Sequence, residues 1–435
     1  MSGQLTGLLT ERVFRALDAR LERDVDRPVA LALSGGGDSM ALLDLARAWA
    51  GARGRRLLAL TVDHGLNPDS PDWSRRAQTA ARAMGADWRG LSWDGAKPTT
   101  GLPAAARQAR HRLLAEAARA AGARVILTGH TADDAIEGDW MRAEGSTLGA
   151  LRAWSPSPVW PQGRGLMLLR PLLDETRQAL RDHLTARGLD WIEDPANADL
   201  RFARGRARAA LAAARERAPS APASQAVPPP SSIQNTTGGL IVVRGASARV
   251  LAAAAVCAGG GDRPPRGERL GRVIDRVENG GPFTATLGGA TIHGAGHGAG
   301  GEMVLVRNAG EYARRPTPPL ALTPGVAAVW DGRFEITVHD AGFCVAPAAG
   351  RMAALPRADR AGLKTLHPGV RGGLPVLIRD DGSDPVLAWG RAEVRCLVGP
   401  RLAQALDQTP HERDLDPAPN GATPGNTLSS FPNIH

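Results

Sequence analysis

Cysteine is scarce in this chain, and no long apolar run is present. Cys257, Cys344 and Cys396 are the only three cysteines in 435 residues, and no pair has Cys-x-x-Cys or metal-ligand spacing. Neither a zinc site nor a disulfide framework is therefore expected. No apolar segment is long enough to cross a bilayer, and the N-terminus lacks a basic start followed by an apolar core. We therefore expect a cytoplasmic protein without membrane contact.

Charge and length set two further bounds. Lysine and arginine number 53 against 44 acidic residues, a net charge of +9, and arginine supplies most of the positive side. The resulting pI near 10.7 favours a polyanionic partner but does not identify one. A length of 435 residues is sufficient for two or three domains, each with its own core.

A glycine-rich turn organises the first half of the chain. Residues 29–33 are a short apolar run, typical of a buried strand, and residues 40–49 carry apolar side chains at helical spacing. The turn between them consists of Ser34, Gly35, Gly36, Gly37, Asp38 and Ser39. Adjacent glycines let backbone N–H groups close on an anion, and the following helix adds the positive end of its dipole.

Phosphate binding is the function that this turn favours, because strand, glycine turn and helix occur in the required order. The two serines can donate hydrogen bonds, and Asp38 can bind a divalent metal or cap the helix. The structural alternative is an ordinary glycine-rich turn in which Asp38 is only an N-cap. The Walker pattern and the dinucleotide spacing are both absent, so neither of those nucleotide-binding classes is indicated.

Apolar strands alternate with helical segments along the first half of the chain. This order predicts an α/β fold, with a doubly wound parallel sheet in the N-terminal domain and smaller α- and β-containing regions after it. Ligands of such sheets bind beyond the carboxyl ends of the strands. Asp38, Asp63 and the group His130, Asp133 and Asp134 each follow an expected strand. We therefore expect them to converge on one crevice.

Two of these loops have a structural alternative as well as a functional one. Asp63 and His64 could form a polar turn in which the carboxylate bonds its own backbone, or could lie on the ribose side of a nucleotide. Asp133, Asp134 and Glu137 could simply complement a helix N-terminus. With Mg²⁺ the same carboxylates would support a bound triphosphate. His130 could then bind the transferring phosphate or shuttle a proton.

The motifs taken together carry a family resemblance. Residues 34–39 resemble the SGGxDS loop of the PP-loop ATP pyrophosphatases, which split ATP into AMP and pyrophosphate. The whole set resembles the tRNA(Ile)-lysidine synthetase family: Val-Asp-His-Gly-Leu at 62–66, Ala-Arg-x-x-Arg at 106–110, Gly-His-x-x-Asp-Asp-x-x-Glu at 129–137, Arg-Pro-Leu-Leu at 170–173 and Glu-Asp-Pro-x-Asn-x-Asp at 193–199. The match covers roughly the first half, and the second half is only loosely similar, chiefly at 330–334.

The resemblance implies a ligase that forms a carbon–nitrogen bond. Such enzymes use ATP and Mg²⁺ to adenylate the 2-carbonyl oxygen of the wobble cytidine in the isoleucine tRNA whose anticodon is CAU, and the amine of L-lysine then displaces AMP. Nucleotide binding would fall to the six turn residues with Asp63, His64, Gly129 and His130. The implied catalytic residues are Asp38, His130, Asp134 and Glu137. Asp38 and Asp134 would hold the metal, and Asp134 and Glu137 would face the lysine ammonium.

Four arginines are implied to contact the tRNA or the reacting nucleotide. Arg107 and Arg110 match the family's Ala-Arg-x-x-Arg, and Arg204 and Arg208 match its Arg-Asn-x-x-Arg with Gly205 in place of asparagine. The alternative for all four is a solvated basic face. The chain also departs from the family pattern, and these departures bear on the lysine and nucleotide pocket: Ala135, Gly138, Thr147 and Ala150.

The domain organisation is read from composition. We expect a catalytic domain at 1–217, an Ala/Pro/Ser-rich linker at 218–236, a partly helical region at 237–310, a β-rich domain at 311–410 and a disordered tail at 411–435. The arginine content of the second half, and its separation by the linker, suggest that it clasps the tRNA.

Two other functions remain open at this stage. One is another PP-loop enzyme such as a tRNA cytidine thiolase, although none of the cysteines lies near the motifs. The other is a nucleotide- or RNA-binding module without turnover. The sequence does not fix the oligomeric state, for which a homodimer is one alternative.

Overall fold

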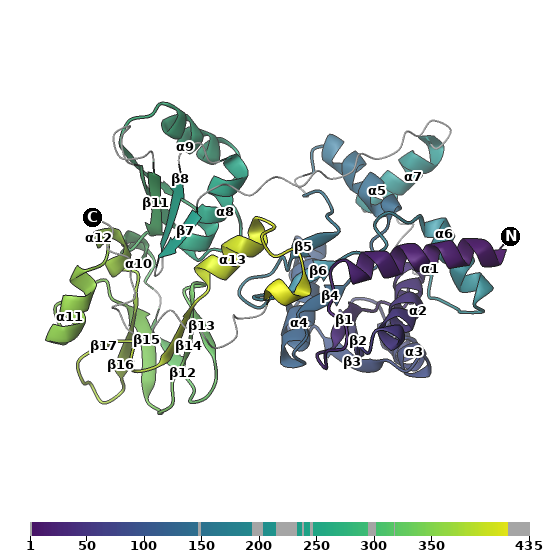
Figure 1. Cartoon of the computed structure of the whole chain (residues 1–435), viewed down its shortest axis with the longest axis horizontal. Helices are drawn as coiled ribbons and strands as arrows, with labels where there is room; N and C mark the ends of the chain where they lie inside the picture. Colours follow the sequence, from purple (N-terminus) through teal and green to yellow (C-terminus); the bar gives the residue numbers. More distant parts are fainter. Residues whose placement is uncertain are drawn as a thin grey trace. The chain divides into compact units, whose positions relative to one another are not determined.

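The computed structural model describes residues 2–146, 149–193, 203–214, 233–236, 239–243, 247–294, 302–316 and 318–415 (Figure 1). The chain divides into two compact units. Unit 1 comprises Met1–Val227 and Thr409–Asp416, and unit 2 comprises Pro228–Gln408 and Pro417–His435. Within the described ranges, no helix has the length and apolar character needed to cross a membrane.

Unit 1 is built on a six-stranded sheet of order β3-β2-β1-β4-β6-β5. Its strands are β1 Val29–Ala32, β2 Leu57–Asp63, β3 Asp87–Ser92, β4 Val125–Leu127, β5 Trp154–Pro156 and β6 Met167–Leu169. All neighbours are parallel except β5, which runs antiparallel to β6 at the edge. The doubly wound sheet expected from the sequence is confirmed, whereas the edge strand β5 was not predicted because its Trp-Ser-Pro sequence has no apolar run and contains a proline.

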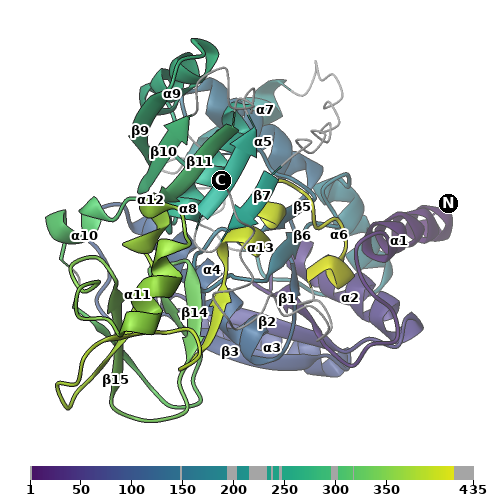
Figure 2. The same ribbon diagram turned by 60° about the vertical axis from the view of Figure 1, so that its left-hand side comes forward.

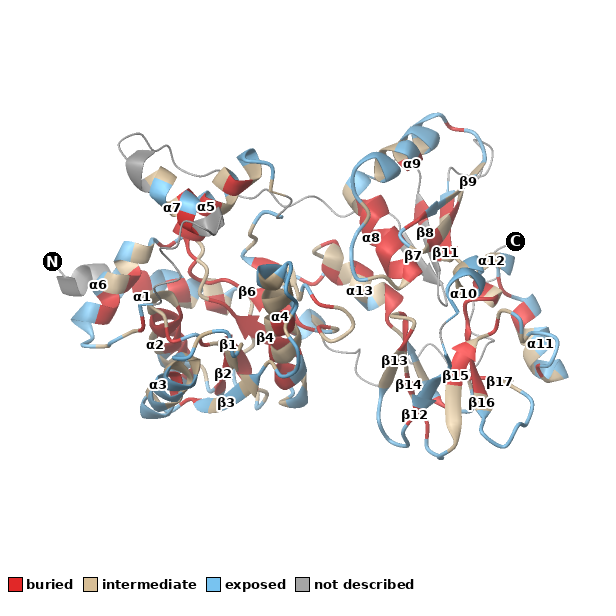
Figure 3. Ribbon diagram, turned by 180° about the vertical axis from the view of Figure 1, so that it is seen from behind, coloured by how far each residue is buried: buried red, intermediate tan, exposed pale blue. Residues whose placement is uncertain are grey.

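Helices cover both faces of this sheet, because alternate strand residues point to opposite sides. Val29 and Leu31 of β1 pack into one core, and Ala30 packs into a second core on the other face. The first core includes residues of α1 Ser2–Asp18, α2 Gly37–Ala52, α3 Ser70–Ala83 and α6 Arg177–Ala186, and the second those of α4 Leu102–Ala120. Figure 3 shows β1, β2, β4 and β6 largely as buried ribbon, whereas the edge strand β3 is mostly exposed.

Two more helices of unit 1 lie near the carboxyl ends of the strands. These are α5 Ala132–Ala143, which follows β4, and α7 Ala203–Ala214, which packs against α5. Thr131 caps α5, because its hydroxyl accepts from the Asp134 backbone and the Asp134 carboxylate accepts from the Thr131 backbone. This reciprocal capping fixes the first turn of α5 and the side chain of Asp134 with it.

Unit 2 is mainly β-structure. Its first sheet has the order β7-β8-β11-β10-β9, with β7 Ile233–Thr236, β8 Gly239–Val243, β9 Phe283–Leu287, β10 Ala290–Gly294 and β11 Glu302–Arg307. The buried helix α8 Ala248–Gly259 packs on β8, β10 and β11, and α9 Glu268–Glu278 packs on β9 (Figure 2). The apolar residues of α8 and of this sheet form one core.

Two smaller sheets complete unit 2. One has the order β12-β15-β16-β17, from Leu320–Leu322, Phe343–Pro347, Pro375–Arg379 and Val386–Leu387, and the other has the order β13-β14-β18, from Ala328–Trp330, Phe334–Thr337 and Glu393–Cys396. Short helices α10 Gly310–Arg314, α11 Arg357–Lys364, α12 Pro368–Arg371 and α13 Val398–Ala405 connect or flank them. The expected boundary near residue 310 stays a prediction.

The end of the described chain returns to unit 1. Residues 411–415 were expected to belong to a disordered tail, but Thr409–Asp416 clusters with unit 1 and contains the 3₁₀ turn Glu412–Leu415. The expectation fails at this point because Glu412 is fully buried against Arg55, a contact 357 positions distant in sequence. The remainder of the expected tail, from residue 416, lies outside the described residues.

Candidate functional site

The site lies where the sheet order reverses. Strand β1 pairs with β2 on one side and with β4 on the other, so the loops after β1 and β4 leave the sheet side by side. Gly129 follows β4, and a Cβ there would lie only 3.0 Å from the carbonyl oxygen of Asp38. The expected convergence of the loop at 34–39 with the loop at 129–131 is therefore observed, and Gly129 is required for their close approach.

The glycine loop adopts a shape that its residues impose. Gly35 has a φ of +84°, and Gly36 is the N-cap of α2 in extended conformation. The Ser39 hydroxyl donates to the Gly36 carbonyl at 2.9 Å and lies 3.1 Å from the Ser34 hydroxyl. These bonds hold the turn at the positive end of the α2 dipole, where an anion is favoured.

A segment far along the chain braces the back of this loop. The Ile192 backbone donates to the Gly35 carbonyl at 2.9 Å, and Ile192 forms an isolated parallel bridge with Gly36. A Cβ on Gly35 would lie 2.6 Å from Ile192 Cδ1, and a Cβ on Gly37 would lie 3.4 Å from Trp191 Cδ1. Gly35 is thus needed for contact with this brace, whereas a Cβ on Gly37 would make an ordinary van der Waals contact with it.

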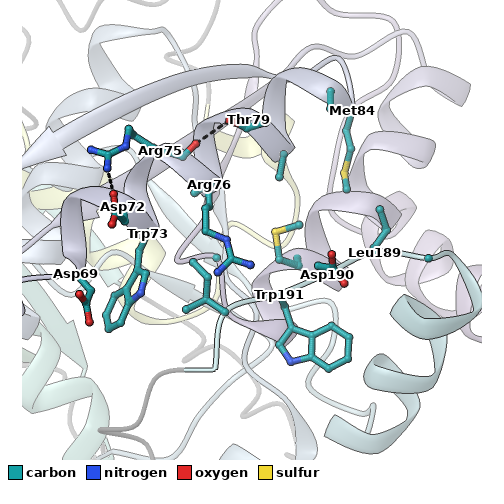
Figure 4. A pocket seen from close by; sticks show the side chains of 17 residues that line it. Asp69, Asp72, Trp73, Arg75, Arg76, Thr79, Met84, Leu189, Asp190 and Trp191 are labelled. Carbon is teal, nitrogen blue, oxygen red and sulfur yellow. Dashed lines mark hydrogen bonds and ion pairs between the residues drawn. The ribbon is translucent and has the colours of Figure 1, made fainter.

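A cavity of about 830 Å³ opens beside the loop, between α3 and the brace (Figure 4). The indoles of Trp73 and Trp191 and the guanidinium of Arg76 line it together with Asp69 and Asp190. Gly35 also belongs to its wall. The cavity therefore offers apolar ring surfaces and both signs of charge next to the glycine loop.

The acidic side chains of the site meet at one arginine. Arg177, the first residue of α6, lies with Nε 3.4 Å from Asp38 Oδ2, Nη2 3.7 Å from Asp134 Oδ1 and Nη1 3.2 Å from Glu137 Oε1. Its backbone N–H also donates to Asp133 Oδ2 at 2.8 Å. The structure thus brings Asp38, Asp134 and Glu137 to a common point, as the sequence predicted for the two loops that carry them.

Glu137 is the most deeply placed of these carboxylates. Its side chain is 3% exposed, and Oε1 accepts from Arg177 and, at 2.8 Å, from Nε of Arg208 on α7. Its second oxygen, Oε2, is buried and has no hydrogen-bond partner among the residues that the structure describes. A buried carboxylate oxygen without a donor is energetically costly, so this atom is an acceptor available to a cationic group.

Burial and neighbouring charge shift the pKa of two groups in this cluster. Burial raises the pKa of Asp38, the negative charge of Asp134 adds to the rise, and Arg177 opposes it. Burial alone would lower the pKa of Arg177, but the carboxylates of Glu137 and Asp38 outweigh it and raise the value. The cluster therefore favours the charged form of Arg177 and disfavours the charged form of Asp38 beside Asp134.

The carboxylate oxygens of Asp38 and Asp134 suit a magnesium ion that completes its coordination shell with phosphate oxygens and water. Asp134 uses Oδ2 in the cap of α5 and directs Oδ1 toward Arg177, beside Asp38 Oδ2. Among the described residues, no group of three or more His, Cys, Asp or Glu side chains could hold a metal by themselves. Two carboxylates at the mouth of a phosphate loop match a metal that arrives with its nucleotide.

The loop after β2 forms a polar turn in which the Asp63 carboxylate bonds the nearby backbone, as its sequence allows. Asp63 Oδ1 accepts from the Gly65 backbone and from the Ser70 hydroxyl, both at 2.7 Å. Burial and the charge of Arg110 lower the pKa of His64, whose ring lies edge-on to Trp93 at 6.0 Å. The structure places Asp63 at the end of the strand next to β1, and its contact with a nucleotide stays a prediction.

The basic residues divide between the site and its surroundings. Arg208 contacts Glu137 directly, whereas the side chain of Arg204 lies outside the described residues. Arg107 and Arg110 lie on α4 near the buried His111, whose pKa falls to about 2 through burial and then through these and other positive neighbours. His130 Nδ1 lies 3.0 Å from the Thr128 hydroxyl.

Residues 9–214 match the family model of the PP-loop domain. A tRNA(Ile)-lysidine synthase of Caulobacter vibrioides is 47% identical over 405 residues, which is 91% of this chain and 97% of that protein. The protein of the same name from Brucella suis is 36% identical over 340 residues, 71% of this chain and 73% of its own length. The fold and its glycine loop thus define a PP-loop protein.

The match to the Caulobacter protein covers 97% of that protein, so it narrows the class from PP-loop proteins in general to one family. The chain belongs to the tRNA(Ile)-lysidine synthase family. A solved U34-tRNA thiolase, NcsA from Methanococcus maripaludis with its [4Fe-4S] cluster, is 17% identical with a TM-score of 0.42 over 49% of this chain and 74% of that one, too distant to bear on the activity.

Two parts of the site were missed by reasoning from the sequence. Arg177 follows the Arg-Pro-Leu-Leu segment by a few positions, and its place at the start of a helix after β6 could have marked it, since β6 pairs with β4. Trp191 and Ile192 directly precede the Glu-Asp-Pro-x-Asn-x-Asp motif at 193–199 and were not assigned a role. Nothing in the sequence indicated that they brace the loop, because contacts between the loop glycines and a distant segment form only in the folded chain.

Proposed function

We propose that this protein ligates L-lysine to carbon 2 of the wobble cytidine in the isoleucine tRNA with anticodon CAU, with ATP as the energy source. Three features support this: family membership, a glycine loop at a helix N-terminus, and acidic groups facing that loop. The observation that carries the proposal is the meeting of Asp38, Asp134 and Glu137 at Arg177 beside the loop.

The reaction has two steps. In the first, the 2-carbonyl oxygen of cytidine attacks the α-phosphorus of ATP, and pyrophosphate leaves. Backbone N–H groups of residues 34–39 and the dipole of α2 would bind the leaving pyrophosphate, where negative charge develops. Mg²⁺, when held by Asp38 and Asp134 and by the phosphates, supplies additional charge neutralisation. His130 lies on the neighbouring loop and would bind the transferring phosphate.

In the second step, the lysine amine attacks carbon 2 and AMP leaves with the former carbonyl oxygen. The incoming ammonium needs a carboxylate to bind it and a base to take its proton. Glu137 Oε2 is suited to this role, because it is a buried acceptor to which no described residue donates. Asp134 Oδ1 would be the second ligand of the ammonium, beside Arg177.

Unit 2 is the part that we assign to tRNA binding. Its helix α9 carries Arg269, Arg272 and Arg276 at spacings of three and four, which places them on one exposed face. Arg107, Arg110 and Arg208 would contact the tRNA at or near the reacting wobble nucleotide. A homodimer stays a prediction, which size-exclusion chromatography would test.

The decisive experiment follows AMP release and the wobble base together. The protein is incubated with isoleucine tRNA and ATP, with and without lysine, and the wobble nucleoside is examined by mass spectrometry. Lysine-dependent AMP release with lysidine formation is expected, and Asp38→Ala should abolish it, whereas the exposed Asp87→Ala should leave it unchanged.

Two other outcomes would replace the proposal. ATP binding without turnover in the wild type would identify a binding module, and a sulfur-containing wobble base formed with a sulfur donor would identify a thiolase. AMP release that persists in Asp38→Ala would remove Asp38 from the metal site.

A further inference from the structure

The segment from Thr409 to Leu415, called the strap here, is bound to unit 1 by a buried ion pair. The Glu412 carboxylate accepts from Arg55 through two bonds, Nη1 to Oε2 at 2.8 Å and Nη2 to Oε1 at 3.0 Å, and both side chains are fully buried. Bidentate pairs of this kind are among the strongest hydrogen-bonded contacts in proteins.

Unit 1 presents a formed socket for this carboxylate. The Arg55 guanidinium also donates to the backbone carbonyls of Glu22 and Arg27, so its plane is fixed from the other side. The Glu22 backbone N–H donates to Glu412 Oε2 at 3.0 Å, and the Glu412 N–H donates to the Arg20 carbonyl at 2.8 Å. Loss of the Glu412 carboxylate would leave the Arg55 guanidinium buried without a counter-charge and would strongly destabilise unit 1. The socket therefore requires a bound carboxylate.

The rest of the strap adds contacts on both sides of the ion pair. The buried indole N–H of Trp154 donates to the Thr409 carbonyl at 2.7 Å, and Arg20 donates to the Pro410 carbonyl at 2.7 Å. Leu415 packs against the main core of unit 1. The chain therefore leaves unit 1 after Val227, passes through residues 228–408 of unit 2, and returns to unit 1 at Thr409. These residues of unit 2 are joined to unit 1 at both ends.

We propose that the strap is a second tether, through which Glu412 acts as a positioning residue for tRNA delivery. A module joined at both ends samples fewer arrangements than one joined through a single linker, so its effective concentration at the partner site is higher. This inference rests on the proposed function, in which unit 2 binds the tRNA and unit 1 carries the chemistry. The tether itself does not depend on that function.

The test lengthens the tether without removing it. A flexible Gly/Ser insertion of about 12 residues between Gln408 and Thr409 keeps every strap contact and adds slack. We expect the KM for tRNA to rise roughly five- to tenfold, with the KM for ATP and the thermal midpoint unchanged. The same insertion after Asp416, beyond the strap, is the matched control and should leave all three values at wild type. Equal KM values for tRNA in the two insertion variants would overturn the proposal.

Hydrogen exchange tests the tether separately from the activity. The amides of Glu22 and Glu412 should be protected in the wild type and in both insertion variants, and should exchange faster in Glu412→Gln, which keeps the shape and loses the charge. Unprotected amides in the wild type would show that the strap is not docked. Protected amides in a wild type that makes no lysidine would retain the tether and reject the proposed function.

Discussion

Arg177 donates to a single oxygen of Glu137 through both terminal nitrogens, with Nη1 and Nη2 at 3.2 and 3.3 Å from Oε1. Oε1 is shared with Arg208, while Glu137 Oε2 has no donor within the described part of the chain. One arginine thus fixes the position of the carboxylate without saturating it. The same guanidinium contacts Asp38, so the metal-binding and ammonium-binding sides of the proposed site are held by one group.

Replacing Arg177 by alanine should affect both stability and turnover. Three carboxylates would lose a common cation, and we expect a loss of roughly 2 kcal/mol in unfolding free energy, less than for a fully buried pair, because the side chain is 21% exposed. Urea denaturation measures this. AMP release should fall at least tenfold. Arg181→Ala on the same helix, which pairs only at the surface, is the control and should change neither; normal turnover in Arg177→Ala would contradict its role.

Gly35→Ala tests the brace against a matched glycine. Gly35 and Gly95 both have strongly positive φ, +84° and +88°, so alanine strains the backbone similarly at either position. Only at Gly35 would the new Cβ meet another side chain, at 2.6 Å from Ile192 Cδ1. We expect the KM for ATP to rise at least tenfold in Gly35→Ala and to stay near wild type in Gly95→Ala. The brace would be irrelevant if both variants bound ATP alike.

The buried His111 predicts a specific acid sensitivity. Burial first, and then Arg110 and Arg107, lower its pKa in the folded protein from 6.5 to about 2. The unfolded chain binds a proton below pH 6.5 that the folded chain does not, so stability falls as the pH drops from 6.5 toward 2. This residue alone should cost about 2 kcal/mol between pH 7 and pH 5.

His111→Gln should remove that part of the acid sensitivity. Urea unfolding at pH 7 and pH 5 measures the difference, and the exposed His339→Gln is the control, which should retain the wild-type dependence. An unchanged loss between the two pH values in His111→Gln would show that His111 becomes protonated in the folded protein.

The exposed arginines of α9 predict a salt-dependent contribution to tRNA binding. Replacing Arg269, Arg272 and Arg276 together by glutamine should weaken binding and reduce the slope of log affinity against log salt by about 2 to 3, since each phosphate contact contributes about 0.7 to 0.9. Filter binding at several salt concentrations measures this, with ATP affinity as the internal control. A wild-type slope in the triple variant would place the tRNA elsewhere.

Truncation near residue 219 is a poorer test of the same proposal. It removes unit 2, but it also removes the strap and leaves Arg55 buried without its carboxylate. A truncated protein that failed to bind tRNA would therefore not separate a lost binding surface from a destabilised unit 1.

The local parts of the fold could be predicted from the sequence. The strand at Val29–Ala32, the turn after it and the strand at Leu57–Asp63 follow from apolar runs and glycine positions that lie within a few residues of one another. Asp38 and Asp134 were placed correctly relative to the sheet, because the carboxyl ends of parallel strands share one edge.

The remaining features depend on contacts between distant residues. Arg177 reaches Asp38 across 139 positions, and Glu412 reaches Arg55 across 357. An arginine among 53 basic residues has no local property that distinguishes an ion-paired position from a solvated one. For the same reason, Glu412 in a polar terminal segment was indistinguishable from a tail residue.

The strap also bears on how this protein is made. Arg55 is synthesised early, and its partner Glu412 follows 357 residues later, so at about 5–20 residues per second the guanidinium waits on the order of 20–70 s on the ribosome. Throughout that interval unit 1 lacks part of its interior. The nascent catalytic half therefore cannot reach its final stability until residues 409–415 have left the exit tunnel, and premature termination anywhere before Glu412 yields an incomplete enzyme.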